Sequence, residues 1–429
     1  MKKIVSVMMG CYLATTLHAQ ENVYPAPQQS QTIAIVNATV HTGTGQVLPN
    51  SSIIIEKGKI VAIGGNAAAG AKVIDAKGKH VYPGIIAPDT ELGLTEFESV
   101  RATNDFAEVG DINPSIRSIV SYNADSKVIG TLRSNGILLA GITPRGGLLS
   151  GSSSVVQLDA WNWEDAAYKS DNGIHFNMPR LMARSNPFGA SASGPSNDAV
   201  KAAMTRIESV REFFREAKTY LETPQHSETN LKYEAVKGLF NKSQKLFIHC
   251  DLVKEMLVAM DIAKEFNFDV VIVGGTDAYL IADLLAKSNI PVILNQPHSL
   301  PVNQDDAVDQ PYATAAQLQK AGVLFCIANE GFWQQRNLMF NAGTAGAYGL
   351  SKEEALSAIT LNAAKILGIA AQTGSLEVGK DANIVISTGD ILDMKSSVIT
   401  NAFIQGREVS LDNKQSQLAE RYKHKYNLQ

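Results

Sequence analysis

The chain has little cysteine, no long apolar run beyond its first twenty residues and no stripe of basic residues. Of its three cysteines, Cys250 and Cys326 lie in apolar, strand-like segments, so we predict buried thiols rather than a disulfide framework. Without a second long apolar run, no transmembrane helix is expected after residue 20. A formal net charge of -4 without a basic stripe gives no support for nucleic-acid binding.

The N-terminus is the exception to this ordinary composition. Two lysines are followed by an apolar run from Ile4 to Leu17, and Ala19 ends a short segment that suits cleavage. This layout is typical of a secretory signal peptide, so we predict that residues 1–19 are removed and that the protein is exported to the periplasm. Gly10-Cys11 suggests lipoprotein processing as the weaker alternative, because Met8-Met9 matches such a signal poorly. Residues 20–31, rich in proline and glutamine, are expected to form a mobile leader.

Paired histidines are also absent. On a strand, residues i and i+2 point the same way, so an H-x-H pair can hold one metal ion. The chain has eight histidines, and none of them forms an H-x-H or H-x-x-x-H pair: His18, His41, His80, His175, His226, His249, His298 and His424. A standard histidine-rich zinc site is therefore not expected.

The two ends of the mature chain share one sequence pattern, in which short strand-like segments are separated by turns. These segments are Ile33–Val36, Ser52–Glu56 and Lys59–Ile63 near the start, and Ala382–Ile386 and Ile399–Ile404 near the end. We predict one composite β-sandwich domain built from residues 32–80 and 370–410, with residues 411–429 as a C-terminal tail.

The middle of the chain alternates strand-like and helical segments, which predicts an α/β barrel or an open parallel sheet over residues 81–369. Periodicity alone does not separate these two folds. No G-x-G-x-x-G fingerprint opens a helix after a strand, which argues against dinucleotide binding.

Three segments of the chain carry distinctive motifs. The first is Pro83-Gly84-Ile85-Ile86, which leads into Asp89-Thr90-Glu91. The second is Ile248-His249-Cys250-Asp251, and the third is the long run from Tyr348 to Ile386. Together these segments resemble the amidohydrolase superfamily, and in particular the imidazolonepropionase-like amidohydrolases. The resemblance implies a (β/α)8 TIM-like barrel beside the composite β-domain, and a hydrolase that acts on C–N bonds other than peptide bonds.

The resemblance also locates a degenerate metal site. Asp89 and Glu91 stand where the family has the H-x-H pair, and only His249 stands where a ligand histidine is expected. After the later strands, Gly274-Gly275 lacks the expected histidine, and Asn329-Glu330 stands where the family has an aspartate. We predict Asp89, Glu91 and His249 as metal ligands, His249 as a group that also polarises the substrate carbonyl, and Glu330 as the catalytic base.

Three interpretations of these residues stay open. The carboxylates suit a divalent ion such as Mg²⁺ or Mn²⁺, with Zn²⁺ as a further candidate, and a bound water would then attack the substrate. A metal-free hydrolase would use a carboxylate as acid or base. A catalytically inactive relative would bind a ligand or an active partner subunit. Two carboxylates on one strand face repel each other unless a cation or a proton lies between them.

Two further polar residues are candidates for substrate binding. Arg145 can bind a substrate carboxylate, and His298 follows a barrel strand, so it should face the active-site end. The glycine- and serine-rich residues 146–154 lack the Lys-Ser/Thr ending of a phosphate loop, so we predict a flexible loop there. The substrate is expected to be a cyclic amide, a small amide or a dipeptide-like compound. Assembly as a homo-oligomer, or as a hetero-oligomer with a related subunit, is also expected.

Overall fold

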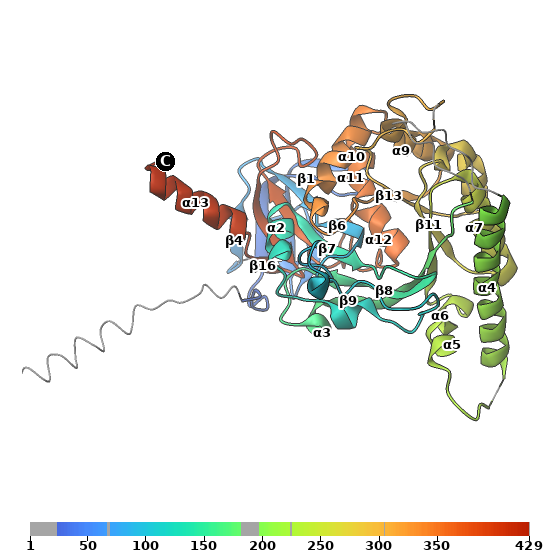
Figure 1. The fold of residues 1–429 in the computed structure, drawn as a ribbon. Coiled ribbons are helices and arrows are strands. Elements are labelled where there is room, and N and C mark those ends of the chain that lie inside the picture. Colours follow the sequence, from blue (N-terminus) through green and yellow to red (C-terminus); the bar gives the residue numbers. More distant parts are fainter. Residues whose placement is uncertain (1–23, 67–68, 182–196, 224, 304, 429) are drawn as a thin grey trace, which may run out of the picture.

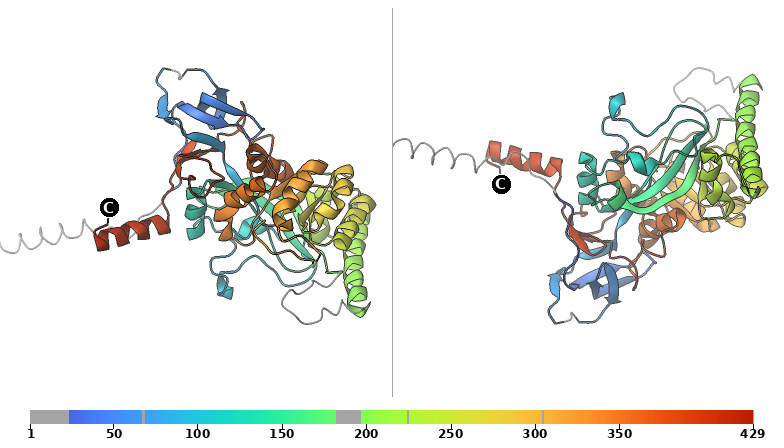
Figure 2. Two further views of the ribbon diagram at one scale, coloured as in Figure 1. Left: turned by 90° about the horizontal axis from the view of Figure 1, so that it is seen from above. Right: turned by 90° about the horizontal axis from the view of Figure 1, so that it is seen from below.

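The computed structural model describes residues 24–66, 69–181, 197–223, 225–303 and 305–428. The predicted signal peptide lies outside these residues. Two eight-stranded sheets organise the chain, one of them the wall of a barrel and the other formed by both chain ends. In Figure 1 the barrel carries most of the helices, and Figure 2 shows the second sheet on one side of it.

The barrel sheet is ordered β13-β12-β11-β10-β9-β8-β7-β6. Its strands are β6 (Ile85–Thr90), β7 (Ile137–Ile142), β8 (Leu149–Gln157), β9 (Ala167–Asn177), β10 (Lys245–Cys250), β11 (Val270–Gly274), β12 (Val292–Leu294) and β13 (Phe325–Ile327). Contacts between polar atoms link the two ends of this order. The Thr90 hydroxyl donates to the Gly331 carbonyl at 3.1 Å, and the Gln335 amide donates to the Asp89 carbonyl at 3.3 Å. The predicted TIM-like barrel is therefore confirmed as a nearly closed sheet.

One part of this barrel departs from a strict (β/α)8 repeat. Strand β8 pairs antiparallel with both β7 and β9, whereas β9 to β13 pair in parallel. The prediction of a flexible loop over residues 146–154 is wrong for the part from Leu149 onward, since every residue of β8 is buried. The serines of this strand are satisfied by neighbouring polar groups. Ser152, for example, donates to Asp171 at 2.7 Å.

Helices cover the outside of the barrel. The α-helices are α2 (Lys127–Ser134), α3 (Trp163–Ala166), α4 (Asn197–Glu222), α5 (Leu231–Ala235), α6 (Lys237–Phe240), α7 (Val253–Phe266), α8 (Ala282–Lys287), α9 (Gln310–Ala321), α10 (Leu338–Ala347), α11 (Lys352–Ala358), α12 (Leu361–Leu367) and α13 (Lys414–Tyr426). Short 3-10 helices are η1 (Arg101–Thr103), η2 (Ser118–Ser121), η3 (Ala278–Ile281) and η4 (Gln334–Asn337). Within the described residues, no helix is both long enough and apolar enough to span a membrane.

The second sheet joins strands from both ends of the chain. It comprises β1 (Ile33–His41), β2 (Val47–Glu56), β3 (Lys59–Ile63), β4 (Lys72–Asp75), β5 (His80–Pro83), β14 (Ile384–Ser387), β15 (Ile399–Ile404) and β16 (Arg407–Val409). The two ends meet where β14 pairs antiparallel with β5. Buried side chains of this sheet's own strands, among them Ile35, Ile53 and Phe403, form a separate hydrophobic core. The shared sheet was expected, while its layering as a sandwich stays a prediction.

The described residues of the predicted leader and of the predicted C-terminal tail lie outside the two sheets and differ in their contacts. In the predicted leader, the backbone of Ala26 donates to Asp159 at 2.8 Å and accepts from Arg407 at 3.1 Å. The predicted C-terminal tail is mostly helix α13, which has no buried residue and extends away from the body of the molecule in Figures 1 and 2. The two predicted thiols, Cys250 and Cys326, are buried and free.

Candidate active site

A cavity of about 410 Å³ lies at the carboxyl ends of the barrel strands. Its lining comes from β6, from the ends of β9, β10 and β11, and from the segments that follow β7, β12 and β13. The lining residues are Asp89, Glu91, Arg145, Asn177, Met178, Arg180, His249, Cys250, Asp251, Glu255, Val273, Gly274, Asn295, Asn329, Glu330 and Gly331. This end of an α/β barrel is where active sites are built, because the loops that follow the strands converge there. Five of the six predicted site residues line this one cavity, and His298 does not.

The centre of the cavity is an arginine bound to two carboxylates. Arg145 binds Asp89 through two hydrogen bonds, from Nη1 to Oδ1 at 3.1 Å and from Nη2 to Oδ2 at 3.0 Å. Its Nε donates to Oε1 of Glu91. This planar fork is the geometry in which a guanidinium binds carboxylates most strongly. The cation that the two carboxylates require is thus a side chain of the protein itself.

The charges of this cluster are firmly held. Burial alone would raise the pKa of Asp89, but the neighbouring Arg145 outweighs it, and the pKa lies below its usual range. Burial also disfavours the charged form of Arg145. Asp89 and Glu91 reverse that effect and raise the pKa of the guanidinium. Asp89 and Arg145 are therefore both charged near neutral pH.

Two histidines lie beside the cluster on neighbouring strands. Nδ1 of His175 and Nε2 of His249 are 2.8 Å apart, so one ring donates to the other. His175 also stacks on Phe247, with ring centroids 4.8 Å apart. Burial lowers the pKa of His249 to about 4, and burial together with His249 lowers that of His175 well below its usual value. Both rings are therefore neutral near pH 7.

The sequence did not single out His175. It lies in β9 within the apolar run Gly173-Ile174-His175-Phe176, where a buried histidine is hard to distinguish from ordinary core packing. The signal that could have found it is positional. Strands β9 and β10 pair in parallel with Phe247 beside His175 and His249 beside Asn177, which places the two histidines two register steps apart on adjacent strands.

A metal ion, as the resemblance implies, can be tested against these residues. Donor atoms of Asp89, His175 and His249 lie within 4.8 Å of one another, and the buried Nε2 of His175 has no partner among the described residues. However, both oxygens of Asp89 are bound to Arg145, and the two histidines share a hydrogen bond. A divalent cation here would lie against a guanidinium, so the residues as arranged do not fit a bound metal ion.

The later strands and the segments that follow them provide few further ligands for a metal ion. Gly274 ends β11 without a side chain that could act as a ligand. After β13, the buried Asn329 donates to the Gln334 carbonyl at 2.7 Å and accepts from Asn341 at 2.9 Å. Glu330 is exposed and lines the cavity at its rim, where the side chain can meet a bound molecule.

The two residues predicted to bind substrate have different positions. Arg145 lines the cavity, but the described hydrogen bonds of its side chain go to Asp89 and Glu91. His298 is exposed outside the cavity lining, and its Nε2 lies 2.7 Å from the Thr344 hydroxyl. The role of each in substrate binding stays a prediction.

The buried Glu255 and the exposed Arg180 also line the cavity. Glu255 accepts from the backbone of Leu181 at 3.1 Å and from that of Leu252 at 3.3 Å, so this buried acid fixes the start of α7. Arg180 is exposed at the cavity edge, and no described carboxylate forms an ion pair with it. Arg180 is thus available to an anionic group in a way that Arg145 is not.

Comparison with known proteins agrees with this architecture. Residues 312–409 match the model of the amidohydrolase family. Imidazolonepropionase from Symbiobacterium thermophilum is 25% identical over 395 residues, covering 79% of this chain and 84% of the relative. Imidazolonepropionase from Thermoplasma volcanium is 24% identical over 377 residues, covering 82% and 88%.

Solved structures extend the similarity to the whole fold. The crystal structure of an amidohydrolase from Thermotoga maritima has a TM-score of 0.76 and 27% identity, covering 88% of this chain and 99% of that chain. Molinate hydrolase, at 15% identity and a TM-score of 0.54, shares the fold over 90% of this chain and 96% of its own. The chain is thus similar in sequence and fold to proteins of the amidohydrolase family.

Proposed function

We propose that this protein is a hydrolase that cleaves a C–N bond other than a peptide bond in a cyclic amide, a small amide or a dipeptide-like compound. The observation that carries the proposal is the cavity at the carboxyl ends of the barrel strands, where carboxylates, guanidinium groups and a neutral imidazole converge. The matched family and relatives named imidazolonepropionase support this class of reaction.

In this proposal the chemistry is divided between the rim and the floor of the cavity. A water molecule attacks the carbonyl carbon, the C–N bond breaks, and the leaving nitrogen takes up a proton. Glu330 at the rim accepts the proton of the attacking water, as a general base must. His249, neutral near pH 7, polarises the carbonyl by a hydrogen bond without adding a charge to the buried floor.

Substrate recognition in the proposal uses Arg180 as well as the predicted residues. Because Arg180 has no described carboxylate partner, it can pair with a substrate carboxylate at the cavity edge. Arg145 contributes indirectly, by holding Asp89 and Glu91 in place. His298 would contact only a substrate that extends beyond the cavity lining.

The test is a hydrolysis screen of cyclic amides, small amides and dipeptides with purified protein. The proposal expects Glu330→Gln to reduce kcat strongly while leaving the melting temperature nearly unchanged, because this side chain is exposed. Glu228→Gln makes the same chemical change at an exposed position outside the cavity, and should leave kcat unaltered. Turnover that survives in Glu330→Gln would remove this residue from the mechanism.

A specific observation favours a second candidate, a catalytically inactive protein that binds a ligand or an active partner subunit. Arg145 neutralises the carboxylates that stand at the predicted metal positions, which gives a stable polar site without an obvious nucleophile. Under this alternative, substrate-like amides raise the melting temperature of the protein but are recovered unchanged. Release of the cleavage products, measured on the same samples, separates the two candidates.

We also propose export to the periplasm and assembly with a second copy or a related subunit, both of which rest on the sequence. Cell fractionation with N-terminal sequencing of the mature protein tests cleavage after Ala19. Light scattering of the purified chain tests assembly.

A further inference from the structure

We propose that Arg145 is the resident cation of this barrel, and that it holds the place between Asp89 and Glu91 that a divalent metal ion would otherwise take. In the native protein the site would then bind no metal ion. The inference concerns the resting site and holds whether or not the proposed hydrolysis occurs. It rests on the contacts of Arg145, on the state of the remaining ligand atoms and on the way Arg145 is anchored.

Arg145 supplies the positive charge that the two neighbouring carboxylates require and that a metal ion would otherwise supply. Three guanidinium nitrogens donate to the two carboxylates, and both oxygens of Asp89 are used. The side chains of Arg145, Asp89 and Glu91 are 22%, 12% and 16% exposed, so little water competes for these bonds. A metal ion would have to break the bidentate contact and would then face the positive guanidinium at close range.

The remaining atoms around the cluster do not compensate for that repulsion. His175 and His249 share one hydrogen bond, which uses a lone pair of one ring. Gly274 offers no side chain, and both ends of the Asn329 amide are engaged by Gln334 and Asn341. A catalytic metal needs several free donors together with an open position for water. Here both oxygens of Asp89 and one nitrogen of each histidine are already engaged, so the buried Nε2 of His175, which has no described partner, is not accompanied by the further free donors that a metal site needs.

The backbone anchors Arg145 so that its side chain is presented to the carboxylates. Its N–H donates to the Phe106 carbonyl at 2.7 Å, and the segment forms a bridge with Ala107. Gly147, two residues on, has φ of +62°, and a Cβ there would lie 2.6 Å from the Gly110 carbonyl oxygen. This close approach of two backbones fixes the turn that delivers the guanidinium, so Arg145 is a built part of the site.

The decisive experiment measures metal content and metal response in two proteins. The wild type, purified without chelator or added metal, should contain far less than one divalent ion per chain by elemental analysis. Its melting temperature should not rise with Zn²⁺, Mn²⁺ or Mg²⁺. In Arg145→Ala, the two carboxylates lose their cation, and Zn²⁺ or Mn²⁺ should raise the melting temperature by several degrees in a saturable way. Adding Asp89→Asn to this variant should remove the response.

The controls keep every outcome informative. Arg117→Ala removes an arginine paired with Asp171 outside the cavity and should show no metal response. A near-stoichiometric ion in the wild type that disappears in Asp89→Asn/Glu91→Gln would overturn the inference. A folded Arg145→Ala variant that binds no metal would overturn the claim that Arg145 holds a metal's place. If Arg145→Ala does not fold, the metal content of the wild type still tests whether the native site binds a metal ion. Neither readout uses turnover, so a failed hydrolysis screen would leave this test intact.

Discussion

Two buried clusters of arginine and carboxylate serve different purposes in this molecule. The cavity cluster consists of Asp89, Glu91 and Arg145, with one cation shared by two acids. The junction cluster consists of Arg133, Asp159 and Arg407, with one acid shared by two cations. The first lines the cavity of about 410 Å³ at the carboxyl ends of the barrel strands. The second is more deeply buried, although Arg133 and Asp159 also line a separate pocket of about 870 Å³.

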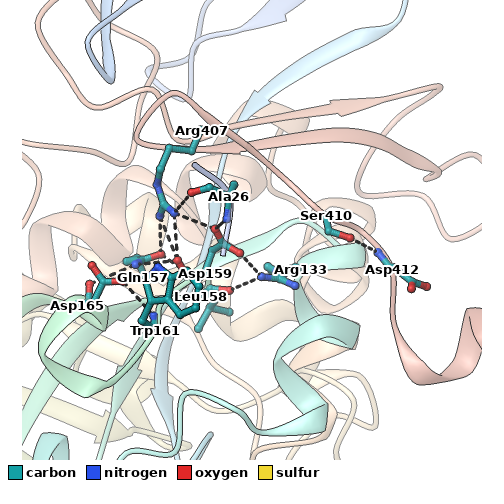
Figure 3. A network of polar contacts seen from close by, with 10 residues as sticks. All are labelled: Ala26, Arg133, Gln157, Leu158, Asp159, Trp161, Asp165, Arg407, Ser410 and Asp412. Atoms are coloured by element: carbon teal, nitrogen blue, oxygen red, sulfur yellow. Dashed lines mark hydrogen bonds and ion pairs between the residues drawn. The ribbon is translucent and has the colours of Figure 1, made fainter. Parts of the chain in front are cut away.

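The junction cluster fastens the barrel to the second sheet. Figure 3 shows Asp159 between the two arginines, with the backbone of Ala26 close by. Arg133 belongs to α2, Asp159 follows β8, and Arg407 begins β16. The side chains of these three residues are at most 8% exposed, and Arg407 also donates to Gln157 at 3.2 Å. Such a densely paired arrangement holds parts of the fold together.

The difference lies in what each cluster leaves accessible. Charged groups that are fully enclosed must be satisfied by one another, because any unpaired charge there is costly. The cavity cluster keeps part of each side chain exposed beside neutral histidines and the rim residues. A ligand can therefore add hydrogen bonds to the cavity cluster without displacing the structural ones. Burial of an ion pair alone thus does not identify a functional site.

The largest effect is expected from Asp159→Asn. This change leaves Arg133 and Arg407 buried without a negative partner, and breaking a buried pair typically costs about 3–5 kcal/mol. Urea unfolding at pH 7 would measure the loss. Glu420→Gln is the matched control, since Glu420 is 71% exposed in its pair with Lys423, and surface pairs contribute about 0–1 kcal/mol. Equal losses in the two variants would show that the junction cluster does not fasten the domains.

A double-mutant cycle on Asp89 and Arg145 should show strong coupling in the cavity cluster. Arg145→Met keeps the length of the side chain but leaves two carboxylates without their cation, and Asp89→Asn removes one of them. We expect the double variant to be more stable than the sum of the single losses predicts, with a coupling of about 0.5–3 kcal/mol. The cycle is measured by urea unfolding. Simple additivity would mean that the guanidinium contact contributes little to stability.

The pH dependence of stability should also separate the two clusters. His249 has a pKa of about 4 in the folded protein, against about 6.5 in an unfolded chain. As the pH falls, the unfolded chain binds the proton first, so stability should decrease between pH 6.5 and pH 4, by at most about 1.4 kcal/mol per pH unit for this group. His249→Asn should flatten that slope. An equally steep slope in the variant would assign the effect to other groups, and the junction cluster contains no histidine.

Asp89 adds a second change at lower pH. Its pKa is held below the usual range, so its stabilising effect is present above about pH 3.9 and is lost as the pH falls toward the lower folded-state value. Asp89→Asn should therefore lose less stability than the wild type on further acidification below about pH 4. The comparison uses the same unfolding measurements at lower pH. Parallel curves for both proteins would contradict the low pKa.

The sequence predicted more of the fold than of the site. The segment Pro83-Gly84-Ile85-Ile86 and the alternating middle of the chain predicted the barrel, because strand and helix periods are local properties. Strand β8 was missed, since Gly151 and its serines suggest a loop by composition. In the structure Gly151 has φ of +129°, and a Cβ there would lie 2.4 Å from the Ile116 carbonyl oxygen. That close approach depends on tertiary structure, which amino-acid composition does not reveal.

For the site, the sequence identified five residues that line the cavity, but neither the pairing of Arg145 with the carboxylates nor the role of His175. Asp89 and Glu91 share one strand segment, and the need for a counter-charge between them was predictable from their spacing. Arg145 is more than fifty residues away in the chain, and its pairing with both acids depends on where β7 ends relative to β6. His175 was missed for the same reason, because its partner His249 lies on the next strand of the barrel.

The smallest effect is expected at His298, which tests the boundary of the cavity. His298→Gln removes the contact between the ring and the Thr344 hydroxyl, and a single hydrogen bond of this kind contributes about 0.5–1.5 kcal/mol. Because His298 is exposed, the loss of stability should lie at the lower end of that range. Binding of a substrate-like amide, followed by calorimetry, should be unchanged in this variant and weakened in Arg180→Met. If His298→Gln weakens binding as much as Arg180→Met does, the ligand extends beyond the cavity lining, and the site reaches the segment after β12.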